Sequence, residues 1–178
     1  MVDKKLLVIV FSVIIVTVGF SNTLTRNGAL FSYPFETVPV HYQKVTVHKI
    51  LDPFTLEVIA DGELVKLKMI GVAYAQNAFE ESGKHFDLRK ALNFTRTMCY
   101  RGSEVYLTYG IKRYDNNGAL LSYIWYRTPG GIWVMHNLSL ITNLKAPYTG
   151  YFHLDDTWIT EFNEADRRYR ENTFETLL

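Results

Sequence analysis

The chain has 178 residues, 48% of them apolar, with 19 basic and 18 acidic side chains. This length can bury one good hydrophobic core rather than two. The balanced charge lacks the basic excess that nucleic-acid-binding proteins use against phosphates, so we consider nucleic acid an unlikely partner. Cys99 is the one cysteine in the sequence, which excludes an intramolecular disulfide and a cysteine-based metal cluster.

The N-terminus predicts export from the cytoplasm. Lys4 and Lys5 precede an uncharged run from Leu6 to Phe20, and the small residue Ser21 follows it. A membrane-spanning helix needs roughly 20 apolar residues, so this shorter run is typical of a secretory signal peptide. An uncleaved membrane anchor is the alternative, which would associate the chain with a membrane. Both readings place the rest of the chain outside the cytoplasm, as a periplasmic, secreted or anchored protein.

Residues 22–43 predict an extended linker, because Arg26-Asn27-Gly28 and two X-Pro pairs break regular structure there. Its aromatic residues would allow the linker to dock on the domain that follows. Removing residues 1–21 takes away two basic side chains and one acidic side chain, which leaves the remainder without net charge.

Residues 45–70 predict a three-stranded antiparallel meander. Residues 45–50, 55–59 and 64–70 alternate apolar and polar side chains, as half-buried strands do. Asp52-Pro53 is typical of a turn, and Asp61-Gly62 is the pair expected in a two-residue hairpin.

The second half predicts helices mixed with strands. Residues 85–99 carry apolar side chains at i, i+3 and i+4 spacing, with Gly102 as the expected C′ residue. Strands are expected at residues 104–109, 120–126 and 132–134, and helices at 137–144 and 158–170. Five antiparallel strands with a helix between the third and fourth is the order of an OB-type barrel, so we expect an α+β domain over residues 44–175 with about three helices. A hydrophobic helix at the N-terminus would precede it.

Four segments resemble the staphylococcal-nuclease-like (thermonuclease) domain. They read L-D-P-F-T-L-E-V (51–58), V-K-L-K-M-I-G-V (65–72), Y-D-N-N-G-A-L-L-S-Y (114–123) and N-L-S-L-I (137–141). The resemblance covers residues 45–170 and implies an OB-fold barrel with flanking helices. In active members of the family it also implies a calcium-dependent phosphodiesterase.

The same resemblance implies that the active site is degenerate here. Phe54 stands at the position of a metal-binding aspartate, and Ala73 at the position of the second one. Lys68 replaces an arginine that neutralises phosphate charge, without its bidentate fork. Gln76 replaces the glutamate that serves as general base, and Ala119 replaces the second arginine. Calcium needs several oxygen ligands, so we expect no catalytic residues, no metal and no cofactor.

Three function classes follow. The leading hypothesis is a catalytically inactive nuclease-like domain that serves as a binding or scaffolding module for protein partners outside the cytoplasm, as a subunit of a membrane-associated or periplasmic assembly. The first alternative is a metal-dependent nuclease with a rebuilt site. Asp52, Thr55 and Lys68 are the residual site candidates, and calcium would be its cofactor. Arg113 and either Glu80 or Glu81 are its further parts.

The third class is a non-catalytic binder of single-stranded nucleic acid or of a glycan. Aromatic residues make up 15% of the chain, which suits stacking surfaces and protein interfaces alike. Most of them are expected in the core. As candidates for contact with a partner we single out Tyr74, Tyr114, Trp125, Trp133 and Tyr148. The five histidines show no zinc-binding spacing.

Overall fold

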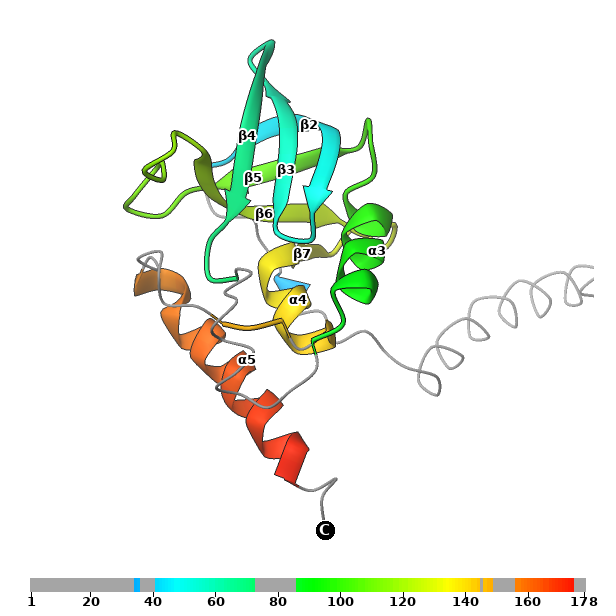
Figure 1. Cartoon of the computed structure of the whole chain (residues 1–178), viewed down its shortest axis with the longest axis vertical. Coiled ribbons are helices and arrows are strands. Elements are labelled where there is room, and N and C mark those ends of the chain that lie inside the picture. Colours follow the sequence, from blue (N-terminus) through cyan, green and yellow to red (C-terminus); the bar gives the residue numbers. More distant parts are fainter. Residues whose placement is uncertain (1–33, 36–40, 73–85, 145, 149–155, 175–178) are drawn as a thin grey trace, which may run out of the picture. The chain divides into compact units, whose positions relative to one another are not determined.

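The computed structural model describes residues 34–35, 41–72, 86–144, 146–148 and 156–174 (Figure 1). The signal peptide or anchor predicted at residues 1–21 and most of the linker predicted at 22–43 lie outside these residues. So do five residues singled out above: Ala73, Tyr74, Gln76, Glu80 and Glu81. In the described part of the chain, no helix is long and apolar enough to cross a membrane.

Five strands close into a barrel, which confirms the α+β prediction and is compatible with an OB fold (Figure 1). Around the barrel the order is β2-β3-β4-β6-β5, and β5 pairs again with β2. The bounds are β2 Gln43–Asp52, β3 Thr55–Ala60, β4 Glu63–Met69, β5 Glu104–Thr108 and β6 Leu120–Arg127.

The barrel is mixed, so the prediction of a fully antiparallel barrel was wrong at one pair. β4 and β6 run parallel, with Leu67 opposite Leu120 and Met69 opposite Ser122. A helix and a strand separate β4 from β6 along the chain, and such a crossover allows two strands to run in the same direction. The alternation of side chains within each strand carries no information about that direction.

The β3–β4 hairpin forms as its sequence predicts. Ala60 pairs with Glu63, so Asp61 and Gly62 make a two-residue loop, and both have positive φ (51° and 86°). Positive φ at both central residues is the type I′ geometry that matches strand twist. In β4, Leu67 and Met69 are buried while Lys66 is exposed, which confirms the predicted alternation.

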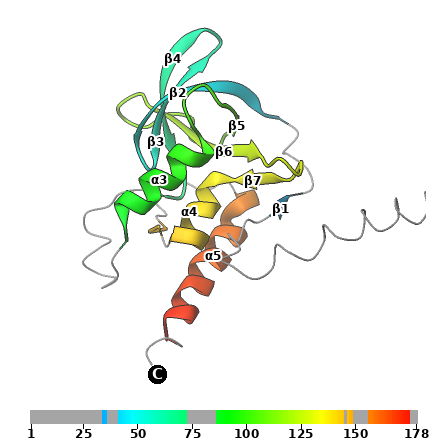
Figure 2. The same cartoon turned by 90° about the vertical axis from the view of Figure 1, so that its right-hand side faces the viewer.

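Three described helices accompany the barrel: α3 Leu88–Met98, α4 His136–Leu144 and α5 Asp156–Phe174 (Figures 1 and 2). Asp87 caps α3, because its carboxylate accepts the backbone N–H of Lys90 at 3.0 Å. The helix ends at Met98 with Cys99 as its C-cap, so the prediction of Gly102 as the C′ residue was wrong. Gly102 instead has φ 83° in the turn that leads into β5.

β6 is buried on both of its faces. Leu121 and Ile124 belong to the fully buried core, and Tyr123 and Trp125 pack against α5 through Trp158. The centroids of the Trp125 and Trp158 rings are 5.2 Å apart. Covering both faces of one strand explains why residues 120–125 are all buried in a continuous run.

Two short strands extend the sheet beyond the barrel: β7 (Trp133–Met135) pairs with β6, and β1 (Pro34–Phe35) pairs with β7. Proline fits this place, because β1 is the edge strand and Pro34 has no N–H to donate. The part of the predicted linker that is described thus adds a strand to the domain (Figure 2).

Candidate functional site

The three residual site candidates lie in one row across the barrel wall. Asp52 of β2 is opposite Thr55 of β3, and Thr55 is opposite Lys68 of β4. Neighbouring strands lie roughly 4.8 Å apart, so the row is compact. The meander therefore brings together the residues that sequence reasoning selected for this site.

The side chain of Asp52 forms a hydrogen bond within the turn that follows β2. Its Oδ1 accepts the backbone N–H of Phe54 at 2.8 Å, which is an Asx turn closing the β2–β3 connection. The Phe54 side chain is only 4% exposed and stacks on Phe86, with ring centroids 5.7 Å apart. The position that the resemblance assigns to a metal-binding carboxylate is therefore part of the hydrophobic core.

Lys68 is bound to a carboxylate that sequence reasoning did not assign to the site. Its Nζ lies 2.5 Å from Oδ2 of Asp115, whose side chain is 8% exposed. The other oxygen, Oδ1, accepts the backbone N–H groups of Asn117 and Ala119, both at 2.8 Å. Burial works to raise the pKa of Asp115, but the Lys68 ammonium and these two amides outweigh it and lower the pKa.

Ala119 lies within the same turn. It is 3% exposed, and its carbonyl accepts the backbone N–H of Asp115 at 2.9 Å. The turn that follows β5 is thus closed around the Asp115 carboxylate, with Gly118 at φ 79°. Sequence reasoning identified this Asp-Asn-Asn-Gly run as a turn, but it missed the ion pair, because Lys68 and Asp115 are 47 positions apart and no local pattern links them.

These contacts limit what the site can do chemically. Within the described ranges, no group of three or more His, Cys, Asp and Glu residues is placed to hold a metal ion. The positive charge of Lys68 is balanced by Asp115, so it offers little net attraction for a phosphate. Asp52 keeps one oxygen outside its Asx turn, and Thr55 is 7% exposed. In the described part of the site, the Lys68 ammonium and one oxygen of Asp52 are thus engaged in contacts within the protein.

Arg113, the further candidate for a rebuilt site, lies elsewhere. Its guanidinium carbon stands 4.2 Å from the centroid of the Tyr109 ring, a cation–π contact. Both residues line an open groove of about 790 Å³ together with His41, Tyr42, Gln43 and Asp61. The Tyr109 hydroxyl donates to Gln43, whose amide donates to Asp61 at 2.8 Å.

The candidate partner-binding aromatics have different environments. Tyr114 is 52% exposed. Trp133 and Tyr148 are half-buried, and Tyr148 packs against Phe162 with ring centroids 5.9 Å apart. Trp125 is not on the surface, because its side chain is fully buried under α5 and its indole N–H donates to Thr108 Oγ1 at 2.9 Å.

Trp133 belongs to an aromatic strip whose other members sequence reasoning missed. Tyr42 contacts Tyr106 edge-on at 5.1 Å between centroids, and Tyr106 contacts Trp133 at 4.8 Å. Arg127 lies 5.8 Å above the Trp133 ring, and Tyr42 is 51% exposed. We call these four residues the aromatic strip. The pairing of β2 with β5, of β5 with β6 and of β6 with β7 places these residues together, so the linear sequence gives no spacing that would reveal the strip.

Comparison of the sequence with models of known protein families finds no match, and a search of curated proteins finds none either. The resemblance to the staphylococcal-nuclease-like domain accordingly stays a prediction.

Proposed function

We propose that this chain is a catalytically inactive nuclease-like domain, with an OB-type barrel, that acts as an extracytoplasmic binding or scaffolding module for protein partners. The observation that supports this most is the Lys68–Asp115 ion pair beside the buried Phe54. Hydrolysis of a phosphodiester needs positive charge that is free to meet the negative charge developing on the oxygens around phosphorus. Here the one cation that replaces the family's arginine is already paired.

The loss of oxygen ligands supports the same proposal. A calcium site takes six to eight oxygens, and removing one stabilising group from such a centre typically costs about 10²–10³ in rate. Phe54 and Ala119 contribute no polar side chain, and Asp52 uses one oxygen to close its turn. Losses at several positions together should leave no measurable catalysis.

The aromatic strip supports binding of a protein. Tyrosine, tryptophan and arginine are the residues most enriched at the centres of protein interfaces. Tyr42 lies half-exposed at one end of the strip, and Arg127 lies exposed over Trp133 at the other. Such a surface can bury large side chains with little loss of conformational freedom on binding.

Calorimetry with calcium tests the inactive site. Titration of the full-length protein should give no heat of specific binding at micromolar calcium. Specific binding that Asp52→Asn removes would contradict the proposal and favour a metal-dependent nuclease. That alternative has one observation in its favour, the row of Asp52, Thr55 and Lys68 on adjacent strands.

Co-purification tests the binding module. A protein partner that uses the aromatic strip should be lost from the Tyr42→Ser variant. It should be retained by Ile111→Ser, which removes a 79% exposed apolar residue outside the strip. Equal recovery with both variants would remove the strip from the proposal. Saturable binding of single-stranded nucleic acid that weakens with salt, or of a sugar, would favour the third class.

A further inference from the structure

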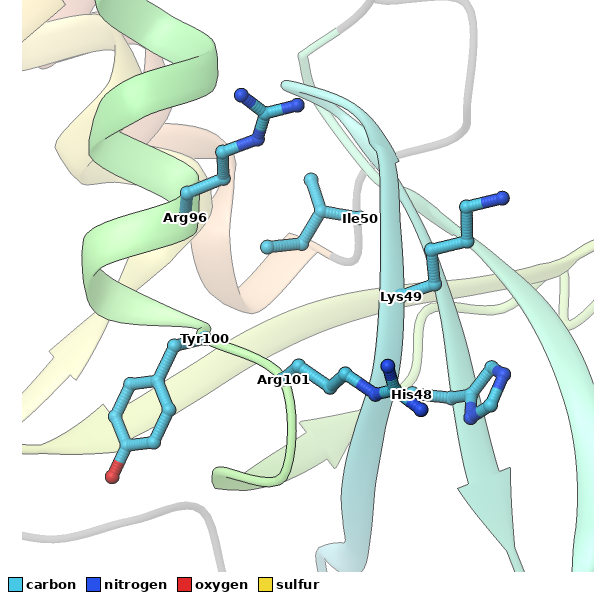
Figure 3. A pocket seen from close by; sticks show the side chains of 6 residues that line it. All are labelled: His48, Lys49, Ile50, Arg96, Tyr100 and Arg101. Carbon is cyan, nitrogen blue, oxygen red and sulfur yellow. The ribbon is translucent and has the colours of Figure 1, made fainter.

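A basic cavity lies between β2 and the C-terminal end of α3. Its volume is about 380 Å³, and its lining residues are His48, Lys49, Ile50, Arg96, Tyr100 and Arg101. Figure 3 shows Arg96 extending from α3 toward the part of β2 that carries Ile50, and Arg101 extending toward His48, whereas the Lys49 side chain extends on the side of the strand away from Arg96. The cavity shares no residue with the site around Lys68.

The backbone around this cavity is irregular and firmly held. The register of β2 against β3 shifts between Val47 and Lys49, which makes His48 the extra residue of a β-bulge. Val47 also accepts the N–H of Gly102 at 2.8 Å and donates its own N–H to Ser103 at 2.9 Å. These bonds fix the turn that carries Arg101 against the strand that carries His48. Bulges at barrel rims commonly redirect side chains at binding sites.

The side chains that line the cavity carry positive charge and no negative charge. Lys49, Arg96 and Arg101 line it together with His48, and no carboxylate does. Among the described residues, no carboxylate lies within 4.0 Å of these three cations. The acidic residue nearest in register is Glu57, which stands opposite Lys49 across the β2–β3 pair.

Favourable placement at the helix end explains only part of this cluster. Arg96 lies in the last turn of α3, where the carbonyl groups favour a cation. That effect acts on a cation at the end of the helix and gives no reason for Lys49, which belongs to a strand. Basic side chains from two elements thus line one cavity, and an anion bound there would reduce the repulsion among their charges.

We propose that this cavity binds a phosphate monoester group. Arginine guanidinium groups present paired N–H donors that match two phosphate oxygens, and Lys49 and His48 add further donors. Ile50 provides an apolar wall, and Tyr100, which is 61% exposed, provides an aromatic one for the organic part of the ligand. The phosphate could belong to a small soluble molecule or to a lipid headgroup. This inference holds whether or not the nuclease-like site is inactive.

Titration with inorganic phosphate tests the proposal. Nuclear magnetic resonance spectra of the ¹⁵N-labelled full-length protein should show saturable shifts of the Gly102 and Ser103 amides and of the Arg96 and Arg101 side chains. Sodium chloride at the same ionic strength should not reproduce them. Losing both arginines in an Arg96→Gln/Arg101→Gln variant should weaken phosphate binding at least about tenfold.

Arg89→Gln is the matched control, because it removes the same exposed charge from the first turn of α3 and Arg89 does not line the cavity. It should bind phosphate within about twofold of the unchanged protein. The side chains of Arg96 and Arg101 are exposed, so circular dichroism should show that the double variant remains folded. Equal affinity in the double variant and the control would overturn the proposal.

Sedimentation with vesicles distinguishes the two sources of phosphate. If a lipid headgroup is the ligand, phosphatidylcholine vesicles containing phosphatidic acid should sediment the protein. The unchanged protein with pure phosphatidylcholine vesicles, and the double variant with either kind of vesicle, should then sediment no more than protein without vesicles. Saturable phosphate binding without sedimentation identifies a soluble ligand. Absence of both would overturn the proposal.

Discussion

Mild acid should destabilise this fold through His136, the first residue of α4. Its side chain is fully buried, and its ring stacks on Phe94 with centroids 5.3 Å apart. The Thr95 hydroxyl donates its single proton to the carbonyl of Pro53, so Nε2 of His136 must donate to Thr95 at 3.0 Å. This fixes the neutral tautomer with a bare Nδ1, which has no hydrogen-bond partner.

The magnitude follows from the pKa. Burial lowers the pKa of His136 to about 3, from 6.5 for a free histidine. Between pH 6.5 and 3, His136 is therefore protonated in the unfolded chain and neutral in the folded protein. Its contribution to the free energy of unfolding is complete above pH 6.5 and is lost as the pH falls below that value. Linkage gives a loss of about 2 kcal/mol between pH 7 and pH 5 from this residue alone.

Urea denaturation of the full-length protein at pH 7 and pH 5 measures this loss. Carboxylates contribute little in that window, because unfolded Asp and Glu titrate near pH 4. The variant His136→Gln should lose about 2 kcal/mol less stability between the two pH values than the unchanged protein. The control His41→Gln, at an exposed position, should behave as the unchanged protein does. An equal loss in all three proteins would refute the assignment to His136.

The remaining predictions concern stability and are checked by denaturation with urea. Gly71→Ala should cost at least about 1 kcal/mol more than Gly118→Ala. Both glycines have φ near +80°, so the backbone strain of an alanine is similar at the two positions. A Cβ at Gly71 would lie 2.3 Å from Phe162 Cε1, whereas a Cβ at Gly118 would meet open space. Equal costs would contradict the packing argument. Asn137→Ala should cost about 3 kcal/mol or more, because the buried amide of Asn137 forms hydrogen bonds with three backbone groups. A cost below about 1 kcal/mol would contradict this role. Asp115→Asn should cost about 2 kcal/mol at pH 7, because it removes the charged partner of Lys68 and of two backbone amides. The cost should shrink as the pH falls below about 4, since a carboxyl with a lowered pKa stabilises only when ionised. A constant cost would contradict the ion pair.

Much of the barrel could be predicted because its signals are local. Asp61 and Gly62 form the predicted hairpin loop, and Asp87 starts the predicted helix as its cap. Cys99 is buried, as a small apolar residue would be, and burial raises the pKa of its thiol to about 12. Each of these outcomes depends on turn geometry, capping or side-chain polarity within a few residues.

What could not be predicted depends on contacts between distant segments. Trp125 was selected as a candidate for contact with a partner, but α5 covers its face of β6, and for this reason Trp125 is buried. The parallel pairing of β4 with β6 likewise depends on how the chain crosses the barrel. The Lys68–Asp115 pair joins residues 47 positions apart, and no local sequence pattern indicates that they form an ion pair.

The central claim is that this nuclease-like site is inactive, and a cleavage assay tests it most directly. Full-length protein, shown to be folded by circular dichroism, is incubated with single- and double-stranded DNA and with RNA across a series of calcium and manganese concentrations. We expect no cleavage above that of the Lys68→Ala variant at any metal concentration. Cleavage that disappears with a chelator and with Lys68→Ala would contradict it and would show that the row of Asp52, Thr55 and Lys68 is an active centre.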